Sequence, residues 1–292
     1  MDRAHRWELS DCMRNDTILI VGGTGKTGRR IAARLRERGV PVRTAARHHA
    51  DVAFDWHGPA THDAALAGVS AVYLVPPAQR LDYAPAVAAF LDRAQAAGVR
   101  HVTSLSARGV DELPPETTPR AVELDLGRRP GLTHAVLRPA WFMQNFDEPL
   151  FLPTGGTLAA PTGVGAEAFV HADDIAEVAV ATLLAPADHD GTGYTLTGPE
   201  ALTFGDVADR IAKASGRPVV HDDVATGAWV DRQRSAGVPD DYAQLLGRLL
   251  AVVRDGGGAT PADDVERVTG HAPRRFDDYA AEEEPLAAWS GI

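Results

Sequence analysis

A glycine cluster between an apolar run and a helical pattern constrains the fold of this chain more than any other feature. In residues 17–31, TILIVGGTGKTGRRI, the apolar run predicts a buried strand, and Ile31 and Leu35, one turn apart, predict a helix. Glycines at this spacing allow a tight turn, a close approach to a pyrophosphate and close helix packing, and the helix N-terminus favours phosphate. A dinucleotide site is therefore expected, with a plain glycine-rich turn as the alternative. Its candidate residues are Gly22, Gly23, Thr24, Gly25, Lys26, Thr27 and Gly28.

Strand patterns alternate with helical patterns through the first half of the chain. Helices are predicted at 83–98 and around 116–127, and further strands at 41–45, 52–54, 71–75, 99–105 and 133–138. This alternation predicts an α/β fold with a doubly wound parallel sheet of the Rossmann type, whose binding crevice lies at the carboxyl ends of the strands. Residues 17–150 are expected to form this NAD(P)-binding domain.

The second half is less regular. We expect residues 151–292 to form a small α/β substrate cap interleaved with the sheet, and residues 1–16 to be a flexible extension. Asp173 or Asp174 is expected to cap an Ala/Val-rich helix. The other expectations are a loop with a hairpin at 151–168, a strand at 194–197, a helix from 203, one or two helices in 226–255 broken near Gly237 and Pro239, and a solvated acidic tail at 277–287.

Composition excludes several classes of function. A net charge of −11 argues against binding to nucleic acid or to an anionic membrane surface. No apolar run approaches the roughly 20 residues that span a bilayer. A single cysteine, Cys12, allows no disulfide framework and indicates a cytoplasmic protein. The histidines lack metal-ligand spacing, so no metal is expected. The chain is expected to be a monomer or a homodimer.

Seven segments in order carry a family resemblance: GGTGKTGRR, FDW at 54–56, AVYLVPP at 71–77, HVTSLSARG at 101–109, LRPAWFMQNF at 137–146, HADDIAEVA at 171–179 and VERVTGHAPRRFDDYA at 265–280. Over nearly all of residues 17–290, the chain resembles the NmrA-like branch of atypical short-chain dehydrogenases/reductases. Within that branch it is most similar to the festuclavine/agroclavine dehydrogenase group of ergot-alkaloid reductases. The resemblance implies that the glycine loop binds NADP(H).

Arg47 follows the second predicted strand, where NAD-binding sites carry an acid that bonds the ribose 2′-OH. An arginine suits a 2′-phosphate instead, so NADPH is expected in preference to NADH, and a solvated loop charge is the alternative. The resemblance places Asp55 and Trp56 near the adenine, although Trp56 serves equally well as packing. It also places residues 75–77, including Val75 and Pro76, near the ribose.

The usual acid–base residues of short-chain dehydrogenases are missing. No tyrosine has a lysine four positions later, and no lysine lies between residues 27 and 212. The chain either binds the dinucleotide without chemistry or reduces a substrate that needs little acid catalysis, such as an iminium carbon. Glu123 is a weak candidate for stabilising a substrate cation, and a surface carboxylate is the favoured alternative. His171 is a weak candidate for a proton shuttle and is more readily explained as a structural histidine.

Side chains at the carboxyl ends of the strands are the remaining candidates. Ser104 and Ser106 end the fifth predicted strand, where they could contact ribose or substrate or be plain hydroxyls. By resemblance, the turn after the sixth strand flanks the nicotinamide and the substrate, with core packing as the alternative. Its candidates are Trp141, Phe142, Met143 and Asn145, while Trp229 and Tyr242 would close over the substrate from the cap.

Together these features predict an NADPH-dependent reductase that transfers hydride to a C=N or activated C=C bond. The expected partner is a cyclic small-molecule substrate, aromatic or alkaloid-like, from secondary metabolism. A redox-sensing regulator of the NmrA type and an NAD(P)H-quinone oxidoreductase are the alternatives.

Overall fold

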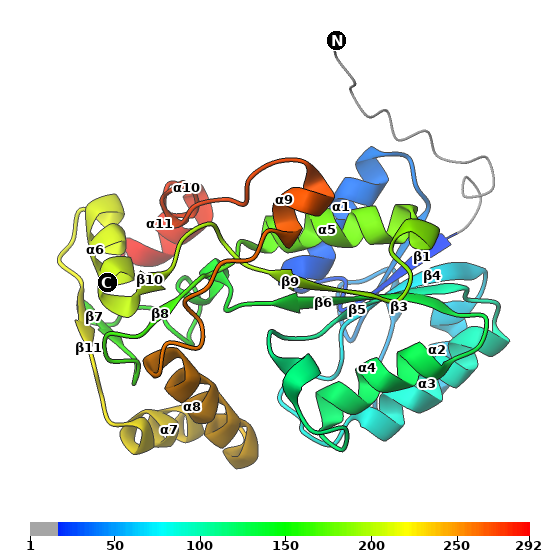
Figure 1. Cartoon of the computed structure of the whole chain (residues 1–292), viewed down its shortest axis with the longest axis horizontal. Coiled ribbons are helices and arrows are strands. Elements are labelled where there is room, and N and C mark those ends of the chain that lie inside the picture. The colour runs from blue at the N-terminus through cyan, green and yellow to red at the C-terminus, as the bar shows by residue number, and fades with distance from the viewer. Residues whose placement is uncertain (1–16) are drawn as a thin grey trace, which may run out of the picture.

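A seven-stranded parallel sheet forms the centre of the computed structural model, which describes residues 17–292 (Figure 1). The extension expected at 1–16 lies outside the described residues. The strand order is β3-β2-β1-β4-β5-β6-β9, which confirms the doubly wound α/β fold. The strands are β1 (Thr17–Val21), β2 (Val42–Ala46), β3 (Val52–Ala53), β4 (Val69–Leu74), β5 (His101–Leu105), β6 (Thr133–Pro139) and β9 (Thr192–Leu196).

Helices cover both faces of this sheet (Figure 1). Along β1, Ile18 and Ile20 pack on one face and Leu19 and Val21 on the other, because successive side chains of a strand point to opposite sides. The first face is covered by α1 (Lys26–Glu37), α5 (Ala172–Leu184) and α9 (Asp264–Thr269). The second is covered by α2 (Ala60–Leu66), α3 (Ala84–Ala96) and α4 (Thr118–Arg128).

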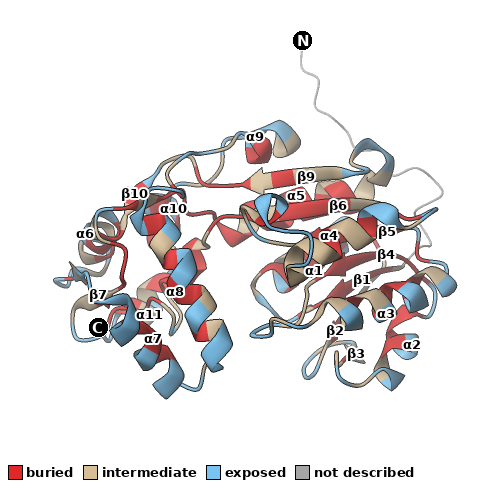
Figure 2. Cartoon of the chain, turned by 60° about the horizontal axis from the view of Figure 1, so that its bottom comes forward, coloured by how far each residue is buried: buried red, intermediate tan, exposed pale blue. Residues whose placement is uncertain are grey.

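A second group of elements lies beyond the carboxyl end of β6 and surrounds its own buried core (Figures 1 and 2). The predicted break in the 226–255 region is confirmed, because Gly237 has a φ of +90° and Pro239 caps the next helix. The elements are β7 (Thr157–Ala159), β8 (Ala166–Glu167), β10 (Leu202–Thr203), α6 (Phe204–Ser215), β11 (Val220–Asp222), α7 (Thr226–Ser235), α8 (Asp240–Arg254), α10 (Phe276–Ala280) and α11 (Glu283–Trp289).

The hairpin expected within 151–168 is present only as a tight turn, in which Thr154 and Thr157 exchange two backbone hydrogen bonds, and the strands of this segment pair elsewhere. Strand β7 pairs in parallel with β11, and β8 pairs in the antiparallel sense with β10. The turn residues between β7 and β8 mark where the chain reverses, but the hydrogen-bonding partners come from segments far along the chain. The division into two domains stays a prediction, although β9 and α5, which follow residue 150, belong to the central sheet and its cover.

Two further expectations need correction. The N-cap of α5 is His171, whose Nδ1 accepts a hydrogen bond from the Asp173 N–H, so neither Asp173 nor Asp174 caps the helix. The acidic tail at 277–287 is only partly solvated: Tyr279, Ala280 and Pro285 are buried, whereas Asp277, Asp278, Glu283 and Glu284 are exposed. Helices α10 and α11 turn the buried side chains inward and most of the carboxylates outward, whereas Glu282 lies 3.1 Å from Nε2 of the buried His171.

None of the helices within residues 17–292 is long and apolar enough to cross a membrane.

Glu167 on β8 makes the stability of this fold depend on pH. It is 3% exposed, and burial raises its pKa to about 7 despite Arg108 at 3.5 Å. Because the pKa of Glu167 is higher in the folded chain than in the unfolded chain, its protonated form stabilises the fold at pH values below the ordinary glutamate pKa. This stabilisation is lost as the pH rises through about 7. Between pH 5 and 8 the unfolding free energy of the parent chain should fall by roughly 2–3 kcal/mol as Glu167 ionises. We expect Glu167→Gln not to show this fall.

Denaturant melts across this pH range would measure the difference, and Glu116→Gln at an exposed position is the matched control. Equal pH dependence in Glu167→Gln and the parent chain would contradict the expectation.

Candidate functional site

The glycine loop joins the end of β1 to the start of α1. Gly22 has a φ of +73°, which favours glycine, and a Cβ on Gly28 would lie 2.2 Å from the Gly22 carbonyl oxygen. A Cβ on Gly25 would meet only that oxygen, at 3.2 Å. No side chain caps α1, whose N-cap is Gly25. The loop is therefore closely packed at Gly28 and open at Gly25, which fits a pyrophosphate at the helix N-terminus.

Lys26, the first residue of α1, connects this loop to the turn after β6. Its Nζ donates to Asn145 Oδ1 at 2.9 Å and lies 2.7 Å from Glu148 Oε2. It also sits 5.8 Å from the centre of the Phe142 ring. The structure thus brings a predicted cofactor residue against two predicted substrate residues. Sequence reasoning had no signal for this contact, because 119 positions separate Lys26 from Asn145.

At the nucleotide end, Arg47 is exposed directly after β2, and its side chain has no hydrogen bond or ion pair within residues 17–292. Arg43, by contrast, is held by the carbonyl oxygens of Ala65 and Ala67. Of these two arginines, only Arg47 therefore has a side chain available to bind a phosphate.

The other residues placed near the nucleotide have mixed surroundings. The ring of Trp56 lies 5.1 Å from that of Phe54 in an aromatic cluster, so packing accounts for its contacts. Asp55 is half-buried, and its carbonyl oxygen is 3.0 Å from His62 Nε2. Val75 lies against Gly22, Pro76 is half-buried, and Ser104 is 1% exposed at the end of β5.

Glu123 on α4 is not the surface carboxylate that was expected, because it is only 5% exposed. Arg138 donates to both of its oxygens, at 3.1 and 2.9 Å, Arg120 donates at 2.9 Å, and Ser106 Oγ donates at 2.7 Å. Burial alone would raise the pKa of Glu123, but the hydrogen bonds from Arg138 and Ser106 outweigh it and lower the pKa. Two guanidinium groups already compensate this carboxylate, so it offers little unpaired negative charge to a substrate cation.

The tyrosines provide no standard acid. Tyr73 is fully buried, its hydroxyl donates to Thr27 at 2.9 Å, and burial raises its pKa far above the ordinary value. Burial also raises the pKa of Tyr83 to about 12. The contacts of Lys26 include no tyrosine, and Lys213 is exposed on α6. In residues 17–292 the tyrosine–lysine pair is therefore absent in space as well as in sequence.

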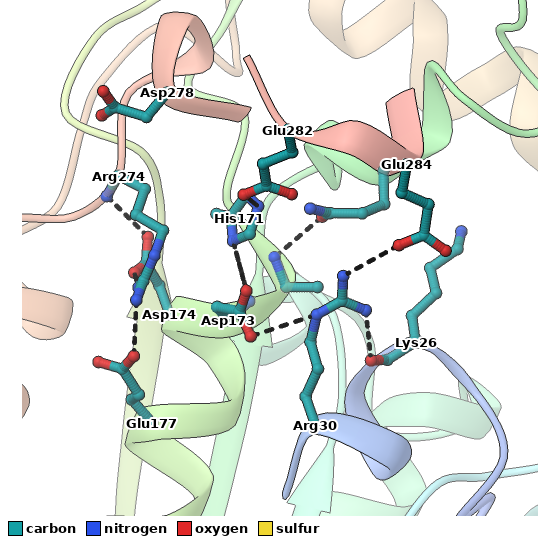
Figure 3. Close-up of polar contacts among 12 residues, drawn as sticks. Lys26, Arg30, His171, Asp173, Asp174, Glu177, Arg274, Asp278, Glu282 and Glu284 are labelled. Carbon is teal, nitrogen blue, oxygen red and sulfur yellow. Dashed lines mark hydrogen bonds and ion pairs between the residues drawn. The ribbon is translucent and has the colours of Figure 1, made fainter. Parts of the chain in front are cut away.

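His171 belongs to a polar network that links α5 to α1 (Figure 3). It is fully buried, and its Nε2 lies 3.1 Å from Glu282 Oε1. Asp173 pairs with Arg30 Nε at 3.2 Å, and Arg30 donates to the Lys26 carbonyl oxygen at 3.0 Å. Burial lowers the pKa of His171 to about 4, so the ring is neutral at pH 7. A neutral, enclosed ring favours a structural role over a proton shuttle.

The predicted substrate residues differ in how far their side chains are exposed. Trp141 and Phe142 are half-buried, and Asn145 is 8% exposed beside Lys26. Met143 and Trp229 are each 1% exposed and pack within the core beyond β6. Trp229 nevertheless lines a pocket formed by α7 and the chain that follows this turn.

Comparisons with known proteins identify the family and confirm the fold. Residues 22–186 match the model of a family described as NAD(P)H-binding. The chain is 37% identical to the uncharacterized oxidoreductase YesF of Bacillus subtilis, covering 92% of this chain and 96% of that one. It is 33% identical to agroclavine dehydrogenase of Claviceps fusiformis, covering 91% and 96%. The crystal structure of NmrA, a negative transcriptional regulator in complex with NAD, has the same fold, with a TM-score of 0.70 at 16% identity over 94% of this chain and 97% of that one.

Proposed function

The chain belongs to the NAD(P)H-binding, NmrA-like family of atypical short-chain dehydrogenases/reductases, and we propose that it is an NADPH-dependent reductase of a cyclic small molecule. The observation that carries the proposal is the bridge from Lys26 to Asn145, which holds the glycine loop against the aromatic turn after β6. The proposed dinucleotide site and the proposed site for a flat substrate would then lie side by side. A cytoplasmic setting is part of the proposal.

The residues fit the cofactor at both ends. The open N-terminus of α1 at Gly25 would hold the pyrophosphate, and the free guanidinium of Arg47 would hold a 2′-phosphate. NADPH, when bound, supplies the hydride. The turn containing Phe142 and Asn145 would position the substrate, and its aromatic side chains would exclude water.

The missing tyrosine–lysine pair restricts the substrate. Within residues 17–292 no tyrosine–lysine pair is present to protonate a substrate oxygen, so the favoured acceptor is a carbon that takes hydride without simultaneous protonation of oxygen. A C=N or activated C=C bond meets this condition, since orientation and electrostatics then provide most of the acceleration. The relative named agroclavine dehydrogenase supports an aromatic or alkaloid-like ring system from secondary metabolism.

The test is NADPH consumption by the purified chain against a panel of cyclic imines, enones and quinones. Turnover of imines or enones above quinones is the expected result. Turnover of quinones alone would make the chain a quinone reductase. Tight NADPH binding with no turnover of any panel member would overturn the proposal in favour of a redox-sensing regulator.

Arg47→Glu tests the cofactor preference. We expect the change to weaken NADPH binding by about 1.5–3 kcal/mol, the scale of a hydrogen bond to a charged group, and to affect NADH little. Titration of cofactor fluorescence measures both. Arg128→Glu, with the same change of charge at an exposed position at the end of α4, should affect neither. Tighter binding of NADH than NADPH by the unmodified chain would contradict the preference.

A further inference from the structure

A pocket of about 420 Å³ lies next to the turn that Lys26 contacts. One wall is the chain that follows Glu148, with the apolar side chains of Leu150, Phe151 and Leu152. The opposite wall is α7, which packs beside α8 (Figure 1). The Phe151 ring lies 5.4 Å from the ring of Trp141, so one residue of the pocket wall packs against the aromatic turn of the candidate site.

The α7 wall presents three polar side chains on one face of the helix. Trp229, Arg232 and Gln233 follow the i, i+3, i+4 spacing that places residues side by side, and all three line the pocket. The Trp229 indole N–H and the Arg232 guanidinium only donate hydrogen bonds, and the Gln233 amide both donates and accepts. This wall is therefore dominated by donors.

These three side chains have no hydrogen bond or ion pair with any residue in 17–292. Trp229 and Gln233 are only 1% and 7% exposed, and neither has a buried polar atom without a partner, so their polar atoms open toward the pocket that they line. The neighbouring Arg234, by contrast, is paired with Asp231 and Asp240. The lining residues that the structure describes include no carboxylate. The positive charge of the exposed Arg232 thus stands without a carboxylate partner at a pocket whose other polar side chains, including Thr154 and Thr157, are neutral.

We propose that this pocket binds the anionic end of a flat apolar substrate, a carboxylate or a sulfonate. An anion is acceptor-rich and matches the three donors, while the rings of the molecule would lie against Leu150 and Phe151. This inference rests on the proposed function, because it takes the occupant to be the molecule that the reductase reduces. Among the aromatic substrates of that proposal, it selects those that carry an anionic group.

Three naphthalenes of matched shape test the assignment by direct titration of the full chain without cofactor. Naphthalene-2-sulfonate is the anion, naphthalene-2-sulfonamide is the neutral isostere, and 2-naphthylmethylamine is the cation. We expect the sulfonate to bind most tightly and the amine most weakly. Arg232→Gln should weaken sulfonate binding about tenfold or more, the scale of a hydrogen bond to a charged group, and change sulfonamide binding less than about threefold. Arg248→Gln, at an exposed position on α8, should change neither.

Sulfonate binding no tighter than sulfonamide binding, an unchanged sulfonate affinity in Arg232→Gln, or no saturable binding of any probe would overturn the assignment. The titrations contain no NADPH, so they separate this inference from the proposed function. Arg232-dependent sulfonate binding would support the pocket even if no substrate is reduced. Reduction of neutral imines by a chain without anion selectivity would support the reductase and reject the pocket.

Discussion

Gly25→Val is expected to weaken NADPH binding by more than about 100-fold and to leave a folded protein. Gly25 has φ −79° and ψ 177°, an extended conformation that valine adopts without strain. A Cβ at this position would lie 3.2 Å from the Gly22 carbonyl oxygen and meet nothing else within 4 Å. The larger side chain would instead occupy the open N-terminus of α1, where the phosphates must approach the free N–H groups.

Gly28→Ala is the matched comparison in the same loop. Its Cβ would lie 2.2 Å from the Gly22 carbonyl oxygen, so the strand and helix would have to separate. We expect a loss of unfolding free energy of about 1–3 kcal/mol or more, the usual scale of overpacking. Cofactor titrations with thermal melts would distinguish the two variants. Normal NADPH binding by Gly25→Val would mean that the loop does not hold the phosphates.

The sequence predicted the central sheet well because its signals are local. Strands β1 and β4 are short, mainly apolar runs, and the alternation of strands with helices predicts a parallel sheet wound in one direction. The pairing of β7 with β11 and of β8 with β10 carried no such signal, because those partners lie far apart in the chain. Turn residues show where a chain bends but do not show which strand it meets.

Predictions about the site residues also depended on whether the signal in the sequence was local or long-range. The glycine loop is a local pattern, and the structure packs Gly28 closely and leaves Gly25 open, as that pattern implies. The burial of Glu123 depends on Arg138, which arrives from β6, 15 residues away. The contact of Lys26 with Asn145 depends on the whole sheet bringing the two carboxyl ends together. The roles of these residues in binding and reduction stay predictions.

Asn145→Ala is expected to lower the turnover number about 10²-fold with any substrate that the screen identifies. Asn145 accepts a hydrogen bond from Lys26, so the change would loosen the turn from the cofactor loop. Hydride transfer requires the reacting carbon close to contact distance, and an error of about 1 Å is enough for a loss of this size. Phe142→Ala, which removes the ring beside Lys26, should act in the same direction.

The controls for this result are three Tyr→Phe variants. Tyr73→Phe, Tyr83→Phe and Tyr194→Phe should each leave the turnover number within about tenfold, whereas loss of a general acid costs roughly 10²–10⁴-fold. Tyr73 is enclosed and bonded to Thr27, and Tyr194 is bonded to His189 at 2.6 Å, so neither hydroxyl is free for a substrate. A single Tyr→Phe change that removes nearly all activity would show that the chain uses an acid. The acceptor would then have to be one whose reduction needs a proton, and the argument for a C=N or activated C=C bond would lose its basis.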